Sequence, residues 1–325
     1  ILPGFIDIHC HGAYGFDTND ANPEGLRKWA KGIVDEGVTS FLATTLTQSE
    51  EVLTNAVSNV AKVVEEGYEG AEILGIHFEG PYLNKAHKGA QPEEYCVYQK
   101  AAHGLIKYIT MAVENDEDYA LTKYCSQNNV VVSIGHSNAT YEQAVQAYAH
   151  GARSMTHVYN AMTPFTHRAN GLVGGALRIR NMYGEIICDG NHSTLAALNN
   201  FFTSKGPDYS IMITDSLMCK GFPVGTKFDF GGQEVVIYPD GSAHLVEAGN
   251  LAGSTLNVNK GLKILIEDAL VPVNYAINAC TSNPARCLHV DDRKGTIGVG
   301  YDADLVVLDR DYEVVQTYCK GVGQK

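Results

Sequence analysis

The chain has 325 residues, of which 45% are hydrophobic and 19% charged, so it suits a large globular domain rather than a small module or a disordered chain. Its formal net charge of −13 argues against a nucleic-acid-binding protein, which needs a basic surface. No apolar run reaches the ~20 residues of a membrane-spanning helix. No basic and apolar leader opens the chain, and because it starts at Ile1 without a methionine we expect further residues upstream.

Short apolar runs alternate with helical patterns along most of the chain. Helices are predicted at 24–36 after Pro23, at 49–66 before Gly67, and at 140–150, where Thr140 and Gln143 have capping-box spacing. Strands are expected at 5–10, 40–45, 72–79, 130–136, 154–159, 185–189, 210–215 and, most weakly, 251–254. Eight strand–helix units predict a parallel (β/α)8 barrel of the TIM type, with an open doubly wound sheet as the alternative. The barrel is favoured because polar residues gather at the carboxyl ends of the expected strands, where barrel enzymes build their sites.

Two segments interrupt this alternation. Residues 227–248 alternate apolar and polar residues around two glycine-containing turns, which predicts hairpins inserted between the seventh and eighth strands. Residues 293–325 lack a helical period and are expected to form the C-terminal part of a small β-sandwich appendage, whose remaining strands we expect before Ile1. The predicted catalytic barrel therefore covers residues 1–292. The eight cysteines form no C-x-x-C pair and are expected to be reduced, mostly buried thiols of a cytoplasmic protein.

The first and third expected strands each end in residue types that can bind a metal ion. His9 and His11 are two residues apart, so both imidazoles point to one face of the strand and could bind one ion, although two structural histidines near a turn would give the same pattern. Glu79 follows an apolar run, where a carboxylate is costly to bury without a metal or a salt-bridge partner. His77 shares its face and is expected to pack beside the site rather than bind metal.

Three further strand ends carry His136, His157 and Asp215, so six candidate ligands are expected at one end of the barrel. Imidazole and carboxylate ligands suit Zn²⁺ or Fe²⁺, with one or two ions per subunit. Such an ion lowers the pKa of bound water and polarises a carbonyl group. Asp215 could then take a proton from that water and pass it to a leaving nitrogen. The set favours amide hydrolysis over redox chemistry, because no glycine-rich dinucleotide motif is present.

At these residues the sequence resembles the amidohydrolase superfamily and, within it, the N-acetylglucosamine-6-phosphate deacetylases. The resemblance runs from PGFIDIHCHG at 3–12 to GYDADLVVLD at 300–309. Its most specific pieces are HFEGPYLN at 77–84, GHSNAT at 135–140, THVYNAM at 156–162, DGNH at 189–192, ITDS at 213–216 and LAGST at 251–255. It implies hydrolysis of the acetamide of N-acetyl-D-glucosamine 6-phosphate to D-glucosamine 6-phosphate and acetate, in amino-sugar catabolism or cell-wall sugar recycling. Deacetylation of the galacto epimer and hydrolysis of another small amide are the alternatives.

The resemblance also implies roles for individual residues. Glu79, His136 and His157 would bind the principal metal, His9 and His11 would permit a second ion, and Asp215 would be the catalytic acid and base. The implied substrate-binding residues are Ala90, Gln91, Asn160, Ala161, Arg168, His192, Leu251, Ala252 and Gly253. Arg168 is implied to reach the neighbouring subunit's site in a homodimer, although an ordinary surface charge would look the same. Gln91 stands where some family members carry a histidine, so a cationic contact is lost there.

Three other functions compete with this interpretation. A dihydroorotase would be expected to carry a bridging lysine on the fourth strand, and none lies in 129–136. Deaminases follow the H-x-H pair with other signatures than the HVYNAM motif at 157–162. A barrel that had lost its chemistry would have lost ligands, whereas this chain keeps six candidates.

Overall fold

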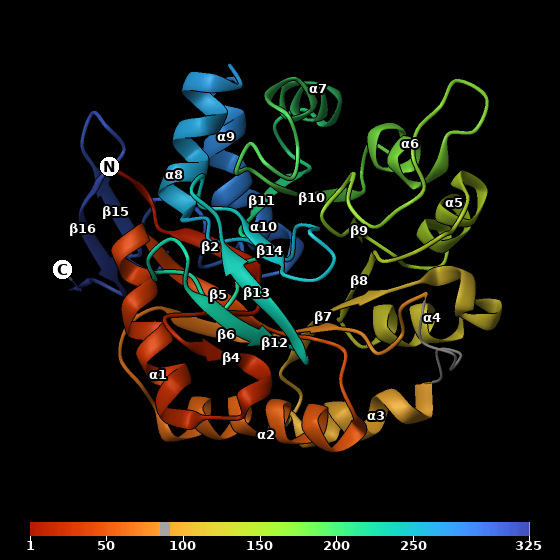
Figure 1. Cartoon of the computed structure of the whole chain (residues 1–325), viewed down its shortest axis with the longest axis horizontal. Helices are drawn as coiled ribbons and strands as arrows, with labels where there is room; N and C mark the ends of the chain where they lie inside the picture. The colour runs from red at the N-terminus through yellow and green to blue at the C-terminus, as the bar shows by residue number, and fades with distance from the viewer. Residues whose placement is uncertain (85–91, 325) are drawn as a thin grey trace.

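The computed structural model describes residues 1–84 and 92–324, and its centre is a barrel of eight parallel strands (Figure 1). In chain order these strands are β2 (Phe5–Cys10), β5 (Val38–Thr45), β6 (Glu72–Glu79), β7 (Ile106–Met111), β8 (Val131–Ile134), β9 (Ser154–Met155), β10 (Tyr183–Ile187) and β11 (Ser210–Ile213). The last strand returns to the first: the amide of Asp215 donates to the carbonyl of His9 at 2.8 Å, and that of His11 to Ser216 at 2.9 Å. The barrel is confirmed, and the open doubly wound sheet is wrong.

Helices surround the barrel and begin where the sequence supplies caps. They are α1 (Pro23–Gly32), α2 (Glu50–Glu66), α3 (Pro92–Ala101), α4 (Ala120–Gln127), α5 (Tyr141–Ala149), α6 (Gly171–Arg178), α7 (Leu195–Lys205), α8 (Val258–Lys263), α9 (Val273–Cys280) and α10 (Ser282–Cys287). The capping box of Thr140 and Gln143 is present at the start of α5. Ser49 caps α2, which ends before Gly67 at a φ of 85°. The expected helix at 24–36 is divided, since α1 is followed by a 3-10 turn at Ile33–Glu36.

The sequence prediction misnumbered the strands. Residues 106–111 form β7, the fourth barrel strand, which was not predicted, because its sequence IKYITM has a lysine among its apolar residues. Residues 251–254 are not a barrel strand; Leu251 makes an isolated bridge to His244, and Ser254 makes one to Ser216. His136, His157 and Asp215 therefore follow the fifth, sixth and eighth strands. The 227–248 insertion comes after the last strand rather than before it.

Three antiparallel strands form the insertion: β12 (Lys227–Phe230), β13 (Gln233–Ile237) and β14 (Ala243–Leu245). A separate four-stranded sheet contains β1 (Leu2–Pro3), β15 (Leu305–Leu308), β16 (Val314–Cys319) and β17 (Val322–Gly323). The start of the chain thus pairs with its last strands, and both ends lie beside this sheet at the left of Figure 1. A short hairpin, β3 (Gly12–Ala13) with β4 (Phe16–Asp17), follows the first barrel strand.

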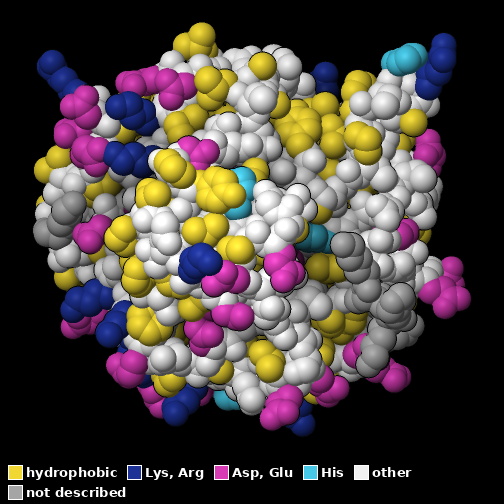
Figure 2. Space-filling model, in the orientation of Figure 1, with side chains coloured by type: hydrophobic (Ala, Val, Ile, Leu, Met, Phe, Trp, Pro, Cys, Tyr) yellow, Lys and Arg dark blue, Asp and Glu magenta, His cyan; other side chains and the backbone are white. Residues whose placement is uncertain are grey.

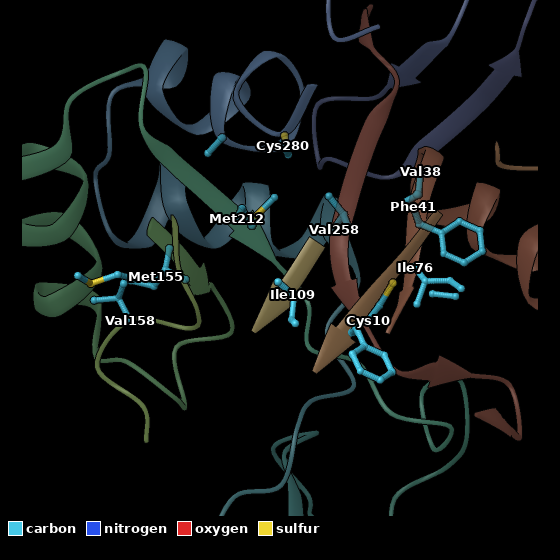
Figure 3. Close-up of a cluster of buried hydrophobic side chains, with 14 of the residues drawn as sticks. Cys10, Val38, Phe41, Ile76, Ile109, Met155, Val158, Met212, Val258 and Cys280 are labelled. Carbon is cyan, nitrogen blue, oxygen red and sulfur yellow. The ribbon is translucent and has the colours of Figure 1, made fainter. Parts of the chain in front are cut away.

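Alternate side chains of the barrel strands enter two different hydrophobic clusters. Ile211 and Ile213 of β11 belong to the cluster inside the barrel, together with Tyr108 of β7. Their neighbours Met212 and Ile109 point outward into the larger cluster under the helices, which Figure 3 shows. This period of two is the pattern of a packed barrel rather than an open pore.

The rest of the molecule agrees with its composition. All eight cysteines are free thiols, and all except Cys96 are buried. Among the described residues no helix is long and apolar enough to cross a membrane. On the face seen in Figure 2, acidic and basic side chains of the described part of the chain are interspersed and form no continuous basic area.

Candidate active site

The candidate ligands meet at the carboxyl end of the barrel. His9 and His11 lie at the end of β2, and Glu79 is the last residue of β6. The other two histidines and Asp215 each lie two residues beyond a strand, at His136 after β8, His157 after β9 and Asp215 after β11. The structure thus brings together all six residues that the sequence placed there.

These last three residues share an unusual backbone. His136, His157 and Asp215 have φ values of 47°, 29° and 51°, the left-handed region that side chains with a Cβ disfavour. Gly135 precedes the first of them because the strands approach closely there, and a Cβ would lie 2.6 Å from the Cβ of Thr156. The local backbone is therefore bent to aim three side chains into the barrel mouth.

Glu79 is the centre of the site. Its Oε2 lies 3.1 Å from Nε2 of His11 and 3.5 Å from Nε2 of His9. Its Oε1 lies 3.4 Å from Nε2 of His136 and 3.5 Å from Nε2 of His157. One carboxylate thus faces two pairs of imidazoles, one pair on each oxygen.

Asp215 faces the first pair of imidazoles. Its Oδ1 lies 3.4 Å from Nε2 of His9 and 3.3 Å from Nε2 of His11. Burial alone would raise the pKa of this carboxyl group, but the charges and hydrogen bonds of His9 and His11 outweigh it and lower that pKa to about 2. Asp215 is therefore a carboxylate at neutral pH, able to accept a proton.

Burial and neighbouring charges also have opposite effects on the pKa values of Glu79 and His11. Burial raises the pKa of Glu79, but His9 and the other imidazoles close to its two oxygens hold that pKa well below its usual range. Burial lowers the pKa of His11, yet Asp215 and Glu79 outweigh it and raise that pKa to about 9. Without another cation the site therefore attracts protons onto its histidines.

Two groups of donor atoms are spaced for a divalent cation. The ligand atoms of His9, His11 and Glu79 lie within 4.8 Å of one another, and so do those of Glu79, His136 and His157. His9 Nε2 and Glu79 Oε1 are buried with no hydrogen-bond partner among the described residues, as expected for atoms that face an ion. The donor set fits one ion, or two ions that share Glu79, and imidazole with carboxylate suits Zn²⁺ or Fe²⁺.

His77 packs against the candidate ligand His9 and is not itself a candidate ligand. Its ring packs edge-on against that of His9, with centroids 4.4 Å apart. Nδ1 lies 3.1 Å from the carbonyl oxygen of Ile8, and Nε2 lies 2.7 Å from the hydroxyl of Thr110. Burial and the nearby His9 lower the pKa of His77 well below its usual value, so it stays neutral. The packing role expected from the sequence agrees with these contacts.

A cavity of about 440 Å³ opens beside the metal-binding side chains. Its lining residues are His11, Leu46, Glu79, His136, His157, Asn160, Ala161, Ile187, His192, Asp215, Leu217, Phe230, Asn250, Leu251, Ala252 and Gly253. His192 is held there by Asp189, whose Oδ2 lies 2.7 Å from its Nδ1. The volume is that of a small-molecule site.

With this geometry in place, comparison with known proteins identifies the family. The sequence model of the Amidohydrolase family matches residues 1–322. The chain belongs to the amidohydrolase family. An N-acetylglucosamine-6-phosphate deacetylase of Bacillus subtilis (strain 168) is 40% identical to it over 333 residues, which cover 99% of this chain and 83% of that protein. An N-acetylgalactosamine-6-phosphate deacetylase of Escherichia coli O157:H7 is 33% identical over 330 residues, which cover 99% and 86%.

Solved structures resemble this amidohydrolase over almost its whole length. An N-acetylglucosamine-6-phosphate deacetylase from Pasteurella multocida superposes with a TM-score of 0.91 at 30% identity, covering 99% of this chain and 86% of that one. The Mycobacterium smegmatis enzyme, solved as a mutant in complex with N-acetyl-D-glucosamine-6-phosphate, gives a TM-score of 0.93 at 28% identity, with 99% and 86% covered.

Three of the predicted substrate-binding residues are absent from the described lining of the cavity, and some residues that line it were not predicted. Arg168 lies exposed in the loop between β9 and α6 and is absent from the cavity of its own chain; its predicted contact with a neighbouring subunit stays a prediction. Ala90 and Gln91 lie outside the described residues. The sequence prediction missed Phe230 and Asn250, which reach the cavity from the inserted sheet and the turn after it. It also missed Glu185, whose Oε2 lies 2.9 Å from Nδ1 of His9.

Proposed function

We propose that this amidohydrolase removes the acetyl group of N-acetyl-D-glucosamine 6-phosphate, giving D-glucosamine 6-phosphate and acetate in amino-sugar catabolism. The observation that carries the proposal is the convergence of four histidines and two carboxylates on one cavity. The 40% identity to a deacetylase of that substrate over 99% of the chain supports the choice of substrate.

In this proposal Glu79, His136 and His157 would hold the principal divalent ion, and His9, His11 and Glu79 could hold another. Zinc or iron would supply a Lewis acid for the acetamide carbonyl and a water of lowered pKa. Glu79 could serve both positions because its two oxygens face different histidine pairs.

Asp215 moves the proton. As a buried carboxylate it accepts a proton from the attacking water at Oδ1 and becomes a carboxylic acid. It then donates that proton to the amide nitrogen, so that an amine leaves rather than its unstable anion. The neighbouring imidazoles favour the ionised form of Asp215, which prepares it for the first transfer.

The cavity would orient the sugar. His192 and the backbone around Asn160, Ala161 and Leu251–Gly253 surround the space next to Asp215, and we assign them with Ala90 and Gln91 to substrate binding. None of the described residues that line the cavity is lysine or arginine. We therefore propose that Arg168 of a second copy binds the phosphate in a homodimer, because a guanidinium suits that anion and the loop that carries Arg168 is exposed.

An acetate-release assay with zinc or iron tests this function. The substrates are N-acetylglucosamine 6-phosphate, its galacto epimer and both sugars without phosphate. We expect fast release from the phosphorylated gluco sugar and release at least ~100-fold slower without phosphate, since each hydrogen bond between a guanidinium and a phosphate is worth about 1.5–3 kcal/mol. Equal rates with and without phosphate would refute the phosphate site. The galacto epimer is the second candidate substrate because one relative at 33% identity is named as a deacetylase of it. A higher rate on the galacto epimer than on the gluco sugar would make it the preferred substrate.

The division of the chain belongs to the same proposal. We assign residues 1–292 to the catalytic barrel, with the inserted sheet at 227–248, and residues from 293 onward to a small β domain of sandwich type. The pairing of Leu2 with Val306 supports a strand contribution from the start of the chain to that domain.

A further inference from the structure

One buried carboxylate in the barrel has no part in the function proposed so far. Glu185 lies on β10, is 0% exposed and reaches across the barrel to the first strand. Its Oε2 lies 2.9 Å from Nδ1 of His9, and its Oε1 has no hydrogen-bond partner among the described residues. A carboxylate buried so completely needs a positive partner or a strong hydrogen bond.

The contact determines which nitrogen of His9 can bind a cation. Nδ1 of His9 is occupied by the 2.9 Å hydrogen bond to the Glu185 carboxylate, with the imidazole as donor, so this nitrogen is not available to a cation. The lone pair is then on Nε2, which faces Glu79 at 3.5 Å and Asp215 at 3.4 Å. A carboxylate behind a histidine also increases its basicity toward a metal.

Among the described residues, the other three histidines proposed as metal ligands have no carboxylate on Nδ1, whereas His192, which is not a proposed ligand, has Asp189 there. Nδ1 of His157 lies 3.2 Å from the backbone carbonyl of Asn160, a neutral acceptor. Nδ1 of His11 is buried with no hydrogen-bond partner among the described residues. The carboxylate therefore acts on the His9–His11 side of Glu79 and not on the side of His136 and His157.

The summed charge of the buried carboxylates also favours two ions. Glu79, Asp215 and Glu185 bring three buried carboxylates together, and within the described residues no lysine or arginine forms an ion pair with any of them. With neutral imidazoles, one divalent ion would leave the group negatively charged. Two divalent ions leave it with one positive charge, which suits a reaction that develops negative charge on a carbonyl oxygen.

We propose that Glu185 is a positioning residue that fixes His9 as a ligand and, through its buried charge, makes this site bind two divalent ions rather than one. The proposal rests on the metal-dependent function given above. It concerns the second ion alone, and the principal ion is held independently of Glu185.

Zinc binding to three variants tests this role. Glu185→Met removes both the charge and the hydrogen-bond acceptor, whereas Glu185→Gln keeps an acceptor and removes the charge. Glu36→Gln is the matched control, because Glu36 is a buried glutamate that pairs with Lys220 and contacts none of the proposed ligands. The two zinc dissociation constants of each purified protein are measured by titration against a chelator, with metal counted by mass spectrometry.

We expect wild type and Glu36→Gln to bind two ions with unchanged constants. In Glu185→Met the dissociation constant of the weaker ion should rise by about 10- to 100-fold while the tighter one stays within about twofold, the usual effect of losing a partner behind a metal ligand. Glu185→Gln should lie between, and it carries the test alone if the Met variant does not fold. A hydrogen-bonded imidazole proton resonance present in zinc-loaded wild type should be absent from Glu185→Met.

Several results would overturn the proposal. These are a single ion in saturated wild type, equal weakening of both ions, or unchanged constants in both Glu185 variants. Because these measurements need no substrate, they are separate from the deacetylase assay. Inactivity toward the acetylated sugars with the expected zinc constants would remove the proposed substrate and leave the role of Glu185 intact.

Discussion

Replacing Lys220 with methionine should destabilise the protein far more than the loss of one surface charge. The ammonium of Lys220 lies 2.7 Å from Glu36, and the two side chains are 0% and 2% exposed. Glu36 also accepts a hydrogen bond from the amide of Val258 at 2.9 Å. Lys220→Met would leave a buried carboxylate with neutral donors only, which costs about 3–5 kcal/mol.

The double variant separates charge from packing. In Lys220→Met with Glu36→Gln neither member of the pair is charged, and the glutamine oxygen can still accept from the amide of Val258. The double variant should therefore be more stable than the sum of the single changes predicts, by about 2–3 kcal/mol of coupling. Trp29, the single tryptophan, is 1% exposed on the neighbouring α1, so its fluorescence reports urea unfolding with zinc held at saturation. Additive losses in the two single variants would refute the reasoning.

Three other predictions concern catalysis and pH. Asp215→Asn should lower turnover by about 100-fold or more, because the amide cannot shuttle a proton, while zinc content stays near wild type; surviving activity would show that another group moves the proton. Although burial opposes the shift, Arg293 and Lys294 lower the pKa of Glu72 to about 2. Since this folded-state pKa is below the unfolded value, Glu72 should stabilise the protein above about pH 4.5, by about 2 kcal/mol after solvent screening, and lose this effect as the pH falls towards 2. The urea stability difference between wild type and Glu72→Gln should therefore shrink with acid, and a difference independent of pH would contradict this sign. Arg168→Ala should raise KM for the phosphorylated sugar at least about tenfold and leave the slow rate on the unphosphorylated sugar unchanged, whereas equal effects on both would exclude a phosphate contact.

The sequence predicted which residues meet at the carboxyl end of the barrel better than it predicted the rest of the cavity lining. His9, His11 and Glu79 could be recognised because strand ends in a parallel barrel meet at one rim, so position along a strand already determines neighbourhood. Phe230 and Asn250 could not, because Phe230 lies in the insertion and Asn250 directly follows it, and the direction of that segment depends on tertiary packing. Glu185 carries no local signal either, since its partner His9 is 176 residues away in the chain.

The strand count failed for a similar reason. Residues 106–111 contain an exposed lysine, so their sequence predicts a strand only weakly. In the structure they form β7, which pairs with β6 on one side and β8 on the other. Residues 251–254 are mostly apolar, as in a buried strand, but Leu251, Ala252 and Gly253 line the cavity, and the barrel has its eight strands without them. Whether each segment forms a barrel strand therefore depends on hydrogen bonds to neighbouring strands more than on its local composition.

The left-handed backbone at His136, His157 and Asp215 has a consequence for laboratory evolution. Each such residue costs about 1–3 kcal/mol relative to an unstrained backbone, and glycine would relieve much of that cost. A library selected for heat tolerance alone should therefore collect glycine at these three positions and lose hydrolysis as it does so. Selection for thermal stability therefore has to include an activity measurement in every round, because at these positions stability and activity favour different residues.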